Sequence, residues 1–378
     1  MKKVSNKTFN SNNPIYNACV GKNGGAIIRT YALGYKQSVL ILLKNVLKNR
    51  TCLDTLVYPI VYNARHYVEL SLKSTIEYLN FINLVFVPNY KKEELRTHSL
   101  YKLMNCVKRL SAVEPRYKEI VDCIGNFVSQ YYEIDDSAET FRFPMSHQGH
   151  ERHLENQGCI NLDDFAKQFC KLTEQFEILE SVDDCLYNEY RVGTVVCGLS
   201  RESLKRIAKK LPKNPWNKET SFGRIADEIK KEFNLSASQF SKVIARIKAH
   251  REFASYYGNE IQLDDISKQR LKYFKDEYEN LEISLKKCDL KTFWICMKRL
   301  SMKFTLKELA ALSTIREIGG NYEYFDEDYD YLKKKMLEER KVDLLGNHLF
   351  HDKMTLKKIK DGLEKMGQQS LIRVLVDC

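Results

Sequence analysis

The chain contains very few residues that stop a helix. Only seven prolines and sixteen glycines are spread over 378 residues. Such sparse punctuation favours long helices over many short strands joined by tight turns. Between residues 34 and 50, and again between residues 55 and 86, apolar side chains recur at helical spacing. We therefore expect an all-α protein.

The same periodicity predicts helices along the rest of the chain. The expected helices include 98–110, 116–132, 162–186, 201–211, 237–257 and 356–375. Asn161 is placed to cap one helix start, and Ser236 with Gln239 forms the pattern of a capping box. We expect a flexible segment over residues 1–30, a helical bundle over 31–198 and a second, basic helical domain over 199–378.

Composition indicates where such a protein works. No apolar stretch approaches the roughly 20 residues that a membrane span requires. The first 14 residues contain lysines but no apolar core of the kind found in secretion signals. The eleven cysteines are odd in number, scattered and without a Cys-x-x-Cys pair, unlike a secreted disulfide scaffold. We expect a cytoplasmic protein that does not enter the membrane.

The net charge of +11 is unevenly distributed. Residues 1–50 hold nine basic residues and no acid, and residues 201–250 hold thirteen basic and five acidic residues. Such blocks suit phosphate-rich partners, although a solvated helix face has the same composition. The candidate nucleic-acid-binding residues of the second half are Lys205, Arg206, Lys209, Lys210 and Lys213. The helices expected after them also have the spacing of a helix-turn-helix, a generic signal.

A group of polar residues interrupts the apolar helix at 55–86. Arg65, Glu69 and Lys73 are spaced by four residues and therefore share one face, and His66 stands beside them. This stripe is either solvated or buried, and a buried charge requires a partner. His98 opens the next expected helix, where a cap explains Thr97 but leaves the histidine unexplained. We treat these five residues as a supporting polar cluster.

A non-helical run follows the acidic residues 133–139. It begins with Phe141-Arg142-Phe143-Pro144 and continues with His147, His150 and His153. Zinc accepts histidine ligands, but the run contains Pro144 and Gly149, which oppose a helix that would align the three imidazoles. We therefore expect no metal and no other cofactor, and a mobile polar loop instead.

These motifs together resemble bacterial HEPN-like helical proteins (higher eukaryotes and prokaryotes nucleotide-binding). The resemblance covers roughly residues 35–190 and rests on three short patterns: Arg65-His66-x-x-Glu69-Leu70-x-x-Lys73, His98-x-Leu100 and Phe141-Arg142-Phe143-Pro144. It implies a bundle of four or five helices, often dimeric. Many members are metal-independent ribonucleases of toxin–antitoxin, abortive-infection and other phage-defence systems.

The resemblance also implies a site. Its hallmark is an arginine followed four to six residues later by a histidine, which Arg142 and His147 match. Arg142 would then hold the scissile phosphate, and His147 would act as acid or base on the ribose 2′-hydroxyl or the leaving oxygen. Arg142 could instead form an ion pair with Glu69 or another acid. The function is accordingly either an RNA-acting defence or toxin-type protein, with an antitoxin or other protein partner, or a non-catalytic scaffold or sensor that dimerises and binds a protein.

Overall fold

A computed structural model describes residues 8, 14–93, 96–146, 151–213, 221–285, 295, 298–339, 345, 349–350 and 352–376. Within these residues every regular element is a helix, and β-type pairing is limited to two isolated bridges. The all-α class expected from the sequence is confirmed for this part of the chain. None of the described helices combines the length and the hydropathy that a membrane crossing requires.

The chain forms two compact units, Met1–Asp184 and Cys185–Cys378. The boundary between them falls within helix α5, before residue 198, where the sequence pattern placed it. The first unit contains short 3₁₀ turns and long α-helices. These are η1 (Pro14–Tyr16), η2 (Gly21–Gly24), α1 (Ile28–Asn49), α2 (Leu53–Phe86), α3 (Leu100–Ser111), η3 (Pro115–Tyr117), α4 (Lys118–Asp135) and the larger part of α5 (Leu162–Arg191).

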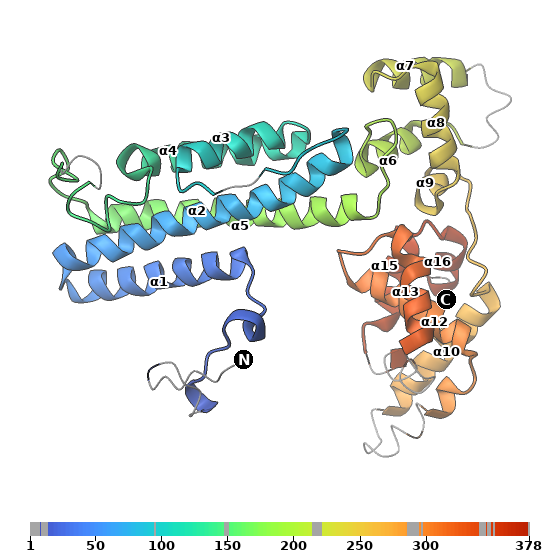
Figure 1. The fold of residues 1–378 in the computed structure, drawn as a ribbon. Helices are drawn as coiled ribbons and strands as arrows, with labels where there is room; N and C mark the ends of the chain where they lie inside the picture. Colours follow the sequence, from blue (N-terminus) through green and yellow to red (C-terminus); the bar gives the residue numbers. More distant parts are fainter. Residues whose placement is uncertain are drawn as a thin grey trace, which may run out of the picture. The chain divides into compact units, whose positions relative to one another are not determined.

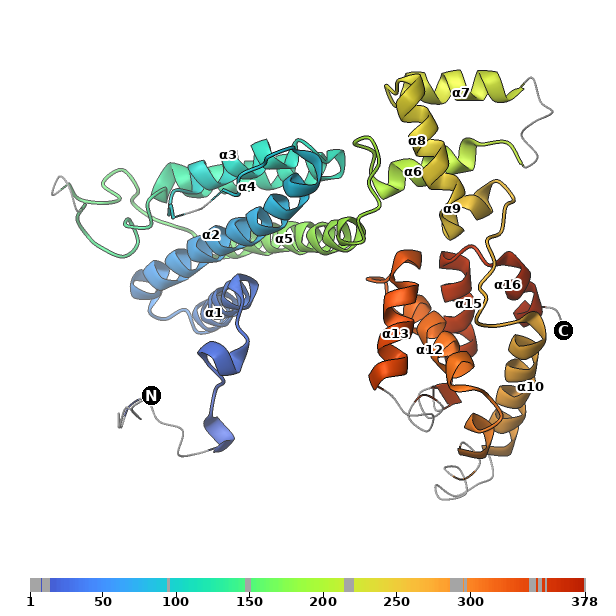
Figure 2. The same cartoon turned by 45° about the vertical axis from the view of Figure 1, so that its right-hand side comes forward.

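Helix α2 is the centre of the first unit. It packs against α1 on one side and α3 on another, and α3 packs in turn on α4 (Figure 1). The ring of Tyr67 on α2 meets Phe169 and Phe176 of α5, with ring centres 5.8 and 5.6 Å apart. The apolar face predicted for α2 is buried, because neighbouring helices cover it from several sides. Figure 2 shows α2 crossing α5 at an angle in a second view.

Local side-chain hydrogen bonds set several helix starts. Asn161 Oδ1 accepts from the backbone N–H groups of residues 163 and 164, at 3.0 and 3.1 Å, which confirms the expected N-cap of α5. The capping box of Ser236 and Gln239 is likewise present at the start of α8 (Ala237–Lys248). Helix α3 is capped by Ser99, whose hydroxyl accepts from the N–H of Lys102 at 3.2 Å. The neighbouring His98 is therefore free of any capping role.

The second unit consists of shorter helices around two apolar clusters. One cluster is formed by α6 (Arg201–Lys210), α7 (Ser221–Glu232), α8 (Ala237–Lys248) and α9 (Arg251–Tyr256). The other includes α10 (Lys268–Leu285), α12 (Leu306–Gly320), η5 (Asp326–Asp328), α13 (Tyr329–Glu339), α15 (Thr355–Lys365) and α16 (Gln369–Val376).

Two helices expected as continuous in the second half are each divided. The helix predicted over 237–257 breaks at His250, whose extended backbone and side chain cap the new start of α9. The helix predicted over 356–375 breaks at Gly367, which has a φ of +69°. A Cβ on this glycine would lie 2.6 Å from the side chain of Ser255. A local side-chain cap accompanies the first break, and a left-handed glycine, at which a side chain would clash with Ser255, accompanies the second.

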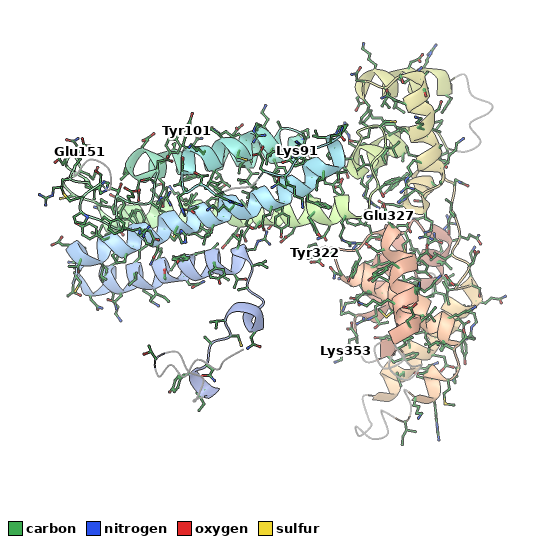
Figure 3. The ribbon with its side chains drawn as sticks, in the orientation of Figure 1. Lys91, Tyr101, Glu151, Tyr322, Glu327 and Lys353 are labelled. Atoms are coloured by element: carbon green, nitrogen blue, oxygen red, sulfur yellow. The ribbon has the colours of Figure 1, made fainter. Side chains whose placement is uncertain are left out.

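Buried ion pairs connect parts of the second unit. Arg201 on α6 contacts the carboxylate of Glu252 on α9, and its Nε lies 3.1 Å from Glu327 Oε1. Glu327, which belongs to η5, is labelled in Figure 3. Burial opposes ionisation of Glu327, but the hydrogen bond from His250 and the charge of Arg201 outweigh burial and lower its pKa. The Arg201 guanidinium is therefore paired within the fold and unavailable to a ligand.

Candidate functional site

The polar residues of α2 form a buried charged centre in the first unit. Arg65 and Glu69, one helical turn apart, are each 1% exposed, and Arg65 Nη1 donates to Glu69 Oε2 at 2.7 Å. The possibility of a solvated stripe is therefore wrong for these two residues. Each buried charge has the partner that burial requires.

Arg65 also holds two other helices in place. Its Nε donates to the carbonyl oxygen of Asp135 at 2.9 Å, and its Nη2 donates to that of Asp136 at 2.8 Å. These carbonyls end α4, where the helix dipole favours a cation. Nη2 also donates to the carbonyl of His98, immediately before α3. The guanidinium therefore binds α2 to the end of α4 and the start of α3.

Glu69 gathers the remaining members of the cluster. Lys73 Nζ donates to its Oε1 at 2.8 Å, and His98 Nδ1 lies 2.9 Å from the same oxygen. His66 Nδ1 is 3.7 Å from Oε2. Burial would raise the pKa of Glu69, but the nearby His66 imidazole and the hydrogen bonds from Lys73 and Arg65 outweigh it and lower the pKa well below its usual range. All five residues proposed as a supporting cluster therefore meet around one carboxylate.

His98 is the member of this cluster that solvent reaches most freely. Its side chain is 66% exposed, although the Glu69 carboxylate that holds its Nδ1 is buried. A carboxylate at Nδ1 favours the tautomer with the proton on that nitrogen and leaves Nε2 as an acceptor. The pair of Glu69 and His98 has the arrangement of an oriented imidazole that can exchange a proton.

Aromatic rings connect this cluster with Arg142. The ring of Tyr62 is nearly parallel to His66, with centres 5.9 Å apart, and Tyr35 meets His66 edge-on at 4.4 Å. Arg142 Cζ lies 5.7 Å from the centre of the Tyr62 ring and 5.0 Å from that of Phe143. Such contacts leave the polar edge of a guanidinium free for another ligand.

The loop after α4 positions Arg142 in a turn. The N–H groups of Arg142 and Phe143 both donate to the carbonyl of Glu139 at 3.0 Å. Further along, the His153 N–H donates to the carbonyl of Pro144 at 3.1 Å, and residues 145 and 152 form an isolated antiparallel bridge. The described part of the loop thus folds back on itself and is non-helical, as Pro144 indicated, whereas the sequence predicted only a mobile polar loop.

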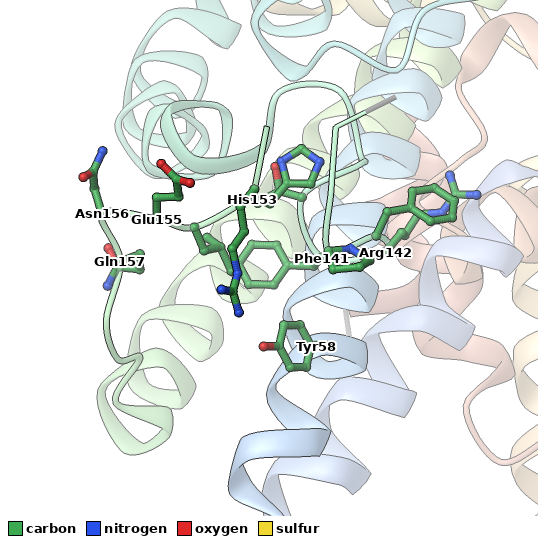
Figure 4. Close-up of a pocket in the computed structure, with 12 residues that line it drawn as sticks. Tyr58, Phe141, Arg142, His153, Glu155, Asn156 and Gln157 are labelled. Atoms are coloured by element: carbon green, nitrogen blue, oxygen red, sulfur yellow. The ribbon is translucent and has the colours of Figure 1, made fainter. Parts of the chain in front are cut away.

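This folded loop surrounds a cavity of about 820 Å³. Figure 4 shows Tyr58 approaching from α2 and the other labelled residues coming from the loop. The wall contains two exposed arginines, one histidine and several aromatic rings: Tyr58, Thr140, Phe141, Arg142, Phe143, Pro144, Arg152, His153, Leu154, Glu155, Asn156 and Gln157. Neither Arg142 nor Arg152 forms an ion pair with any residue of the described ranges.

The two residues expected to be catalytic have different outcomes. Arg142 lies in the cavity wall, and the expected ion pair with Glu69 is wrong because Arg65 occupies that carboxylate. His147 lies outside the described residues, and its role stays a prediction. The described imidazole that shares the cavity with Arg142 is His153, whose Nε2 is buried and has no hydrogen-bond partner within the described ranges.

Sequence reasoning missed the approach of Arg152 and His153 to Arg142. These residues are ten or more positions apart, and the loop brings them together by pairing residue 145 with residue 152. The one available signal was Gly149, a turn-forming residue between the two paired positions. Among the described residues, no group of three or more His, Cys, Asp or Glu side chains could hold a metal ion.

The basic residues proposed on α6 are partly engaged within their own unit. Arg206 Nη2 lies 2.9 Å from Glu232 Oε1, and Lys210 contacts the same carboxylate. Lys205 Nζ lies 3.3 Å from Glu252 Oε1, and Lys209 Nζ is 5.2 Å from the centre of the Tyr256 ring. Lys213 is exposed just beyond the helix. Internal pairing therefore reduces the positive potential that this cluster offers to a phosphate backbone.

Comparison of the chain with family models, curated proteins and solved structures gave no match.

Proposed function

We propose that the chain is a defence or toxin-type protein that acts on RNA. In this proposal its first unit is a HEPN-like bundle, and the loop cavity cleaves a phosphodiester without a metal. The supporting observation is the cavity wall, where Arg142 and Arg152 are exposed and form no ion pair with acidic side chains of the described residues. Exposed arginines next to aromatic rings such as Tyr58 and Phe143 are typical of surfaces that bind single-stranded nucleic acid.

The chemistry requires only groups that such a cavity can supply. A histidine acting as base removes the proton from the ribose 2′-hydroxyl, and the 2′-oxygen forms a bond to phosphorus. The bond from phosphorus to the 5′-oxygen breaks, and an acid returns a proton to that oxygen. The products are a 2′,3′-cyclic phosphate and a free 5′-hydroxyl. Arg142 would stabilise the charge that develops on the phosphate oxygens.

Cleavage of a labelled RNA by purified variants tests this proposal. We expect Arg142→Ala to reduce cleavage by at least a hundredfold, the size of effect seen when one electrostatic donor is removed from a transition state. His147→Ala and His153→Ala, tested separately, identify the histidine that transfers the proton. Lys44→Ala, which removes an exposed charge on α1, is the matched control and should retain activity. Equal cleavage by all four variants, or none by the wild type, would remove the catalytic proposal.

A second candidate is a non-catalytic scaffold or sensor that dimerises. It is favoured by the structural use of Arg65 and Glu69, since packing alone explains their presence. It is also favoured by large apolar side chains exposed on and before α1, at Ile27, Tyr31 and Ile41. Light scattering of the wild type and of Ile41→Lys tests this candidate. A dimer that the substitution converts to a monomer supports it, and a wild-type monomer at high concentration contradicts it.

A further inference from the structure

A second cavity adjoins the loop cavity of the first unit. It has a volume of about 320 Å³ and shares Phe141 and Gln157 with the first cavity. Its wall comes from α2, the end of α4, the loop and the start of α5: Val61, Arg65, Gln130, Tyr131, Ile134, Asp135, Phe141, Gln157, Cys159, Ile160, Asn161, Asp164, Phe165 and Gln168. Both cavities fall in the range of roughly 300–1,000 Å³ typical of small-molecule sites.

The wall of this second cavity is largely aromatic and aliphatic. Phe165 meets Tyr131 edge-on at 6.4 Å between ring centres and lies parallel to Phe169 at 6.2 Å. Phe141 is buried in the wall shared by both cavities, whereas Ile134 is 46% exposed. Flat rings held by their neighbours suit a flat apolar ligand, because ordering them costs little on binding.

The buried carboxylate of Asp135, in the same wall, can accept a further hydrogen bond. Asp135 is 3% exposed, and its Oδ1 accepts from the N–H groups of Glu139 and Thr140 at 3.1 and 3.3 Å. Its Oδ2 has no hydrogen-bond partner among the residues that the structure describes, and Arg65 Nε is 3.9 Å away from it. Buried polar atoms are nearly always hydrogen-bonded, so an unpaired carboxylate oxygen in a cavity wall points to a ligand that donates. The unpaired His153 Nε2 in the adjoining wall is a second such atom.

We infer that the second cavity binds an unpaired nucleobase, while the adjacent phosphate of the same strand lies against Arg142 and Arg152. The inference rests on the proposed action on RNA and names its substrate class, single-stranded RNA. The base stacks on the aromatic wall, as unpaired bases do in sequence-specific RNA sites. An exocyclic amino group donates towards Asp135, which favours adenine, cytosine or guanine over uracil. A free apolar ligand would not account for the exposed Arg142 and Arg152 in the wall of the adjoining cavity.

Binding of labelled strands to the full chain tests the inference by fluorescence anisotropy. Three strands of equal length are compared: oligo(A), oligo(U) and a strand whose bases are replaced by abasic sites. All carry 2′-O-methyl groups, because such strands cannot be cleaved through the 2′-hydroxyl. We expect oligo(A) to bind most tightly and the abasic strand to bind about tenfold or more weakly, the loss produced when base stacking is removed.

Two variants separate the base from the phosphate. Phe165→Leu keeps an apolar side chain but removes the ring, and should weaken oligo(A) about tenfold without changing the abasic strand. Arg142→Ala should weaken all three strands alike. Ile134→Ala removes part of the wall, and Ile178→Ala, 49% exposed on the same α5 as Phe165, is its matched control. Circular dichroism checks that each variant keeps its helical content.

Each outcome decides one part of the inference. Equal binding of oligo(A) and the abasic strand, or unchanged oligo(A) binding by both Phe165→Leu and Ile134→Ala, overturns the base pocket while leaving the proposed action on RNA intact. Equal binding of oligo(A) and oligo(U) overturns the assignment of an amino group to Asp135. If no strand binds, both the inference and the proposed function fail together.

Discussion

The buried carboxylate of Asp183 should make the stability of the first unit depend on pH in an unusual direction. Its side chain has no exposed surface, and it accepts from the hydroxyls of Tyr117 and Thr75, each at 2.8 Å. The nearby cation Arg29 is instead paired with Asp184, at 2.9 Å. Burial raises the pKa of Asp183 to about 7 because the neutral hydroxyls only partly offset the loss of water.

The sign of the effect follows from this pKa. The folded protein holds the proton up to about pH 7, whereas the unfolded chain releases it near pH 3.8. Asp183 therefore lowers the free energy of unfolding progressively as the pH rises from about 4 to 7, and the loss is complete above that range. A difference of about 3 pH units corresponds to about 4 kcal/mol as an upper value.

Asp183→Asn removes this titration and keeps a side chain of nearly the same shape. We expect the variant to be more stable than the wild type by only about 1 kcal/mol at pH 4.5 and by up to about 4 kcal/mol at pH 8. Urea unfolding followed by circular dichroism at several pH values measures the difference.

A matched control is available one residue away. Asp184→Asn removes one carboxylate from the same helix but breaks the pair with Arg29, and should destabilise the first unit at pH 8. The two substitutions therefore have opposite expected signs. A difference between Asp183→Asn and wild type that stays constant from pH 4.5 to 8, or changes by less than about 1 kcal/mol, would refute the argument from burial.

Two further substitutions test other parts of the fold. Glu69→Gln leaves the buried Arg65 without its carboxylate and should cost about 3 to 5 kcal/mol in urea unfolding at pH 7. Because the pKa of Glu69 is lowered, the stability that its carboxylate contributes is present above the usual glutamate range and should decline as the pH falls below about 4. If the stability difference between wild type and Glu69→Gln grew on acidification, this argument would be contradicted. Gly367→Ala should destabilise the second unit more than Gly193→Ala does, since both glycines have a φ of +69° but only the first meets Ser255 within 2.6 Å. Equal losses of stability in the two variants would show that the positive φ alone sets the cost of the substitution.

Local chemistry made several features predictable. Helix class follows from apolar spacing and scarce helix breakers, both of which are properties of short windows of sequence. Asn161 and Ser236 cap helices through atoms three residues away or fewer. Arg65 and Glu69 share a face because helix geometry fixes positions four apart, whatever packs against them.

Long-range packing made the other features unpredictable. Whether the face of Glu69 is wet or buried depends on α3 and α4, which also bring His98 to within 2.9 Å of its carboxylate. The close approach of Ser255, more than a hundred positions earlier, leaves no room for a side chain at position 367.

The sequence by itself therefore determined the helical class, several helix starts and the shared face of Arg65, Glu69 and Lys73. Tertiary structure alone decided that this face is buried, that Arg152 and His153 join Arg142 around one cavity, and that Asp183 is sealed from water. The physical reason is the separation along the chain over which each interaction acts. Helix propensity and capping act within a few residues, whereas desolvation and the pairing of charges depend on whichever distant segments the folded chain places beside them.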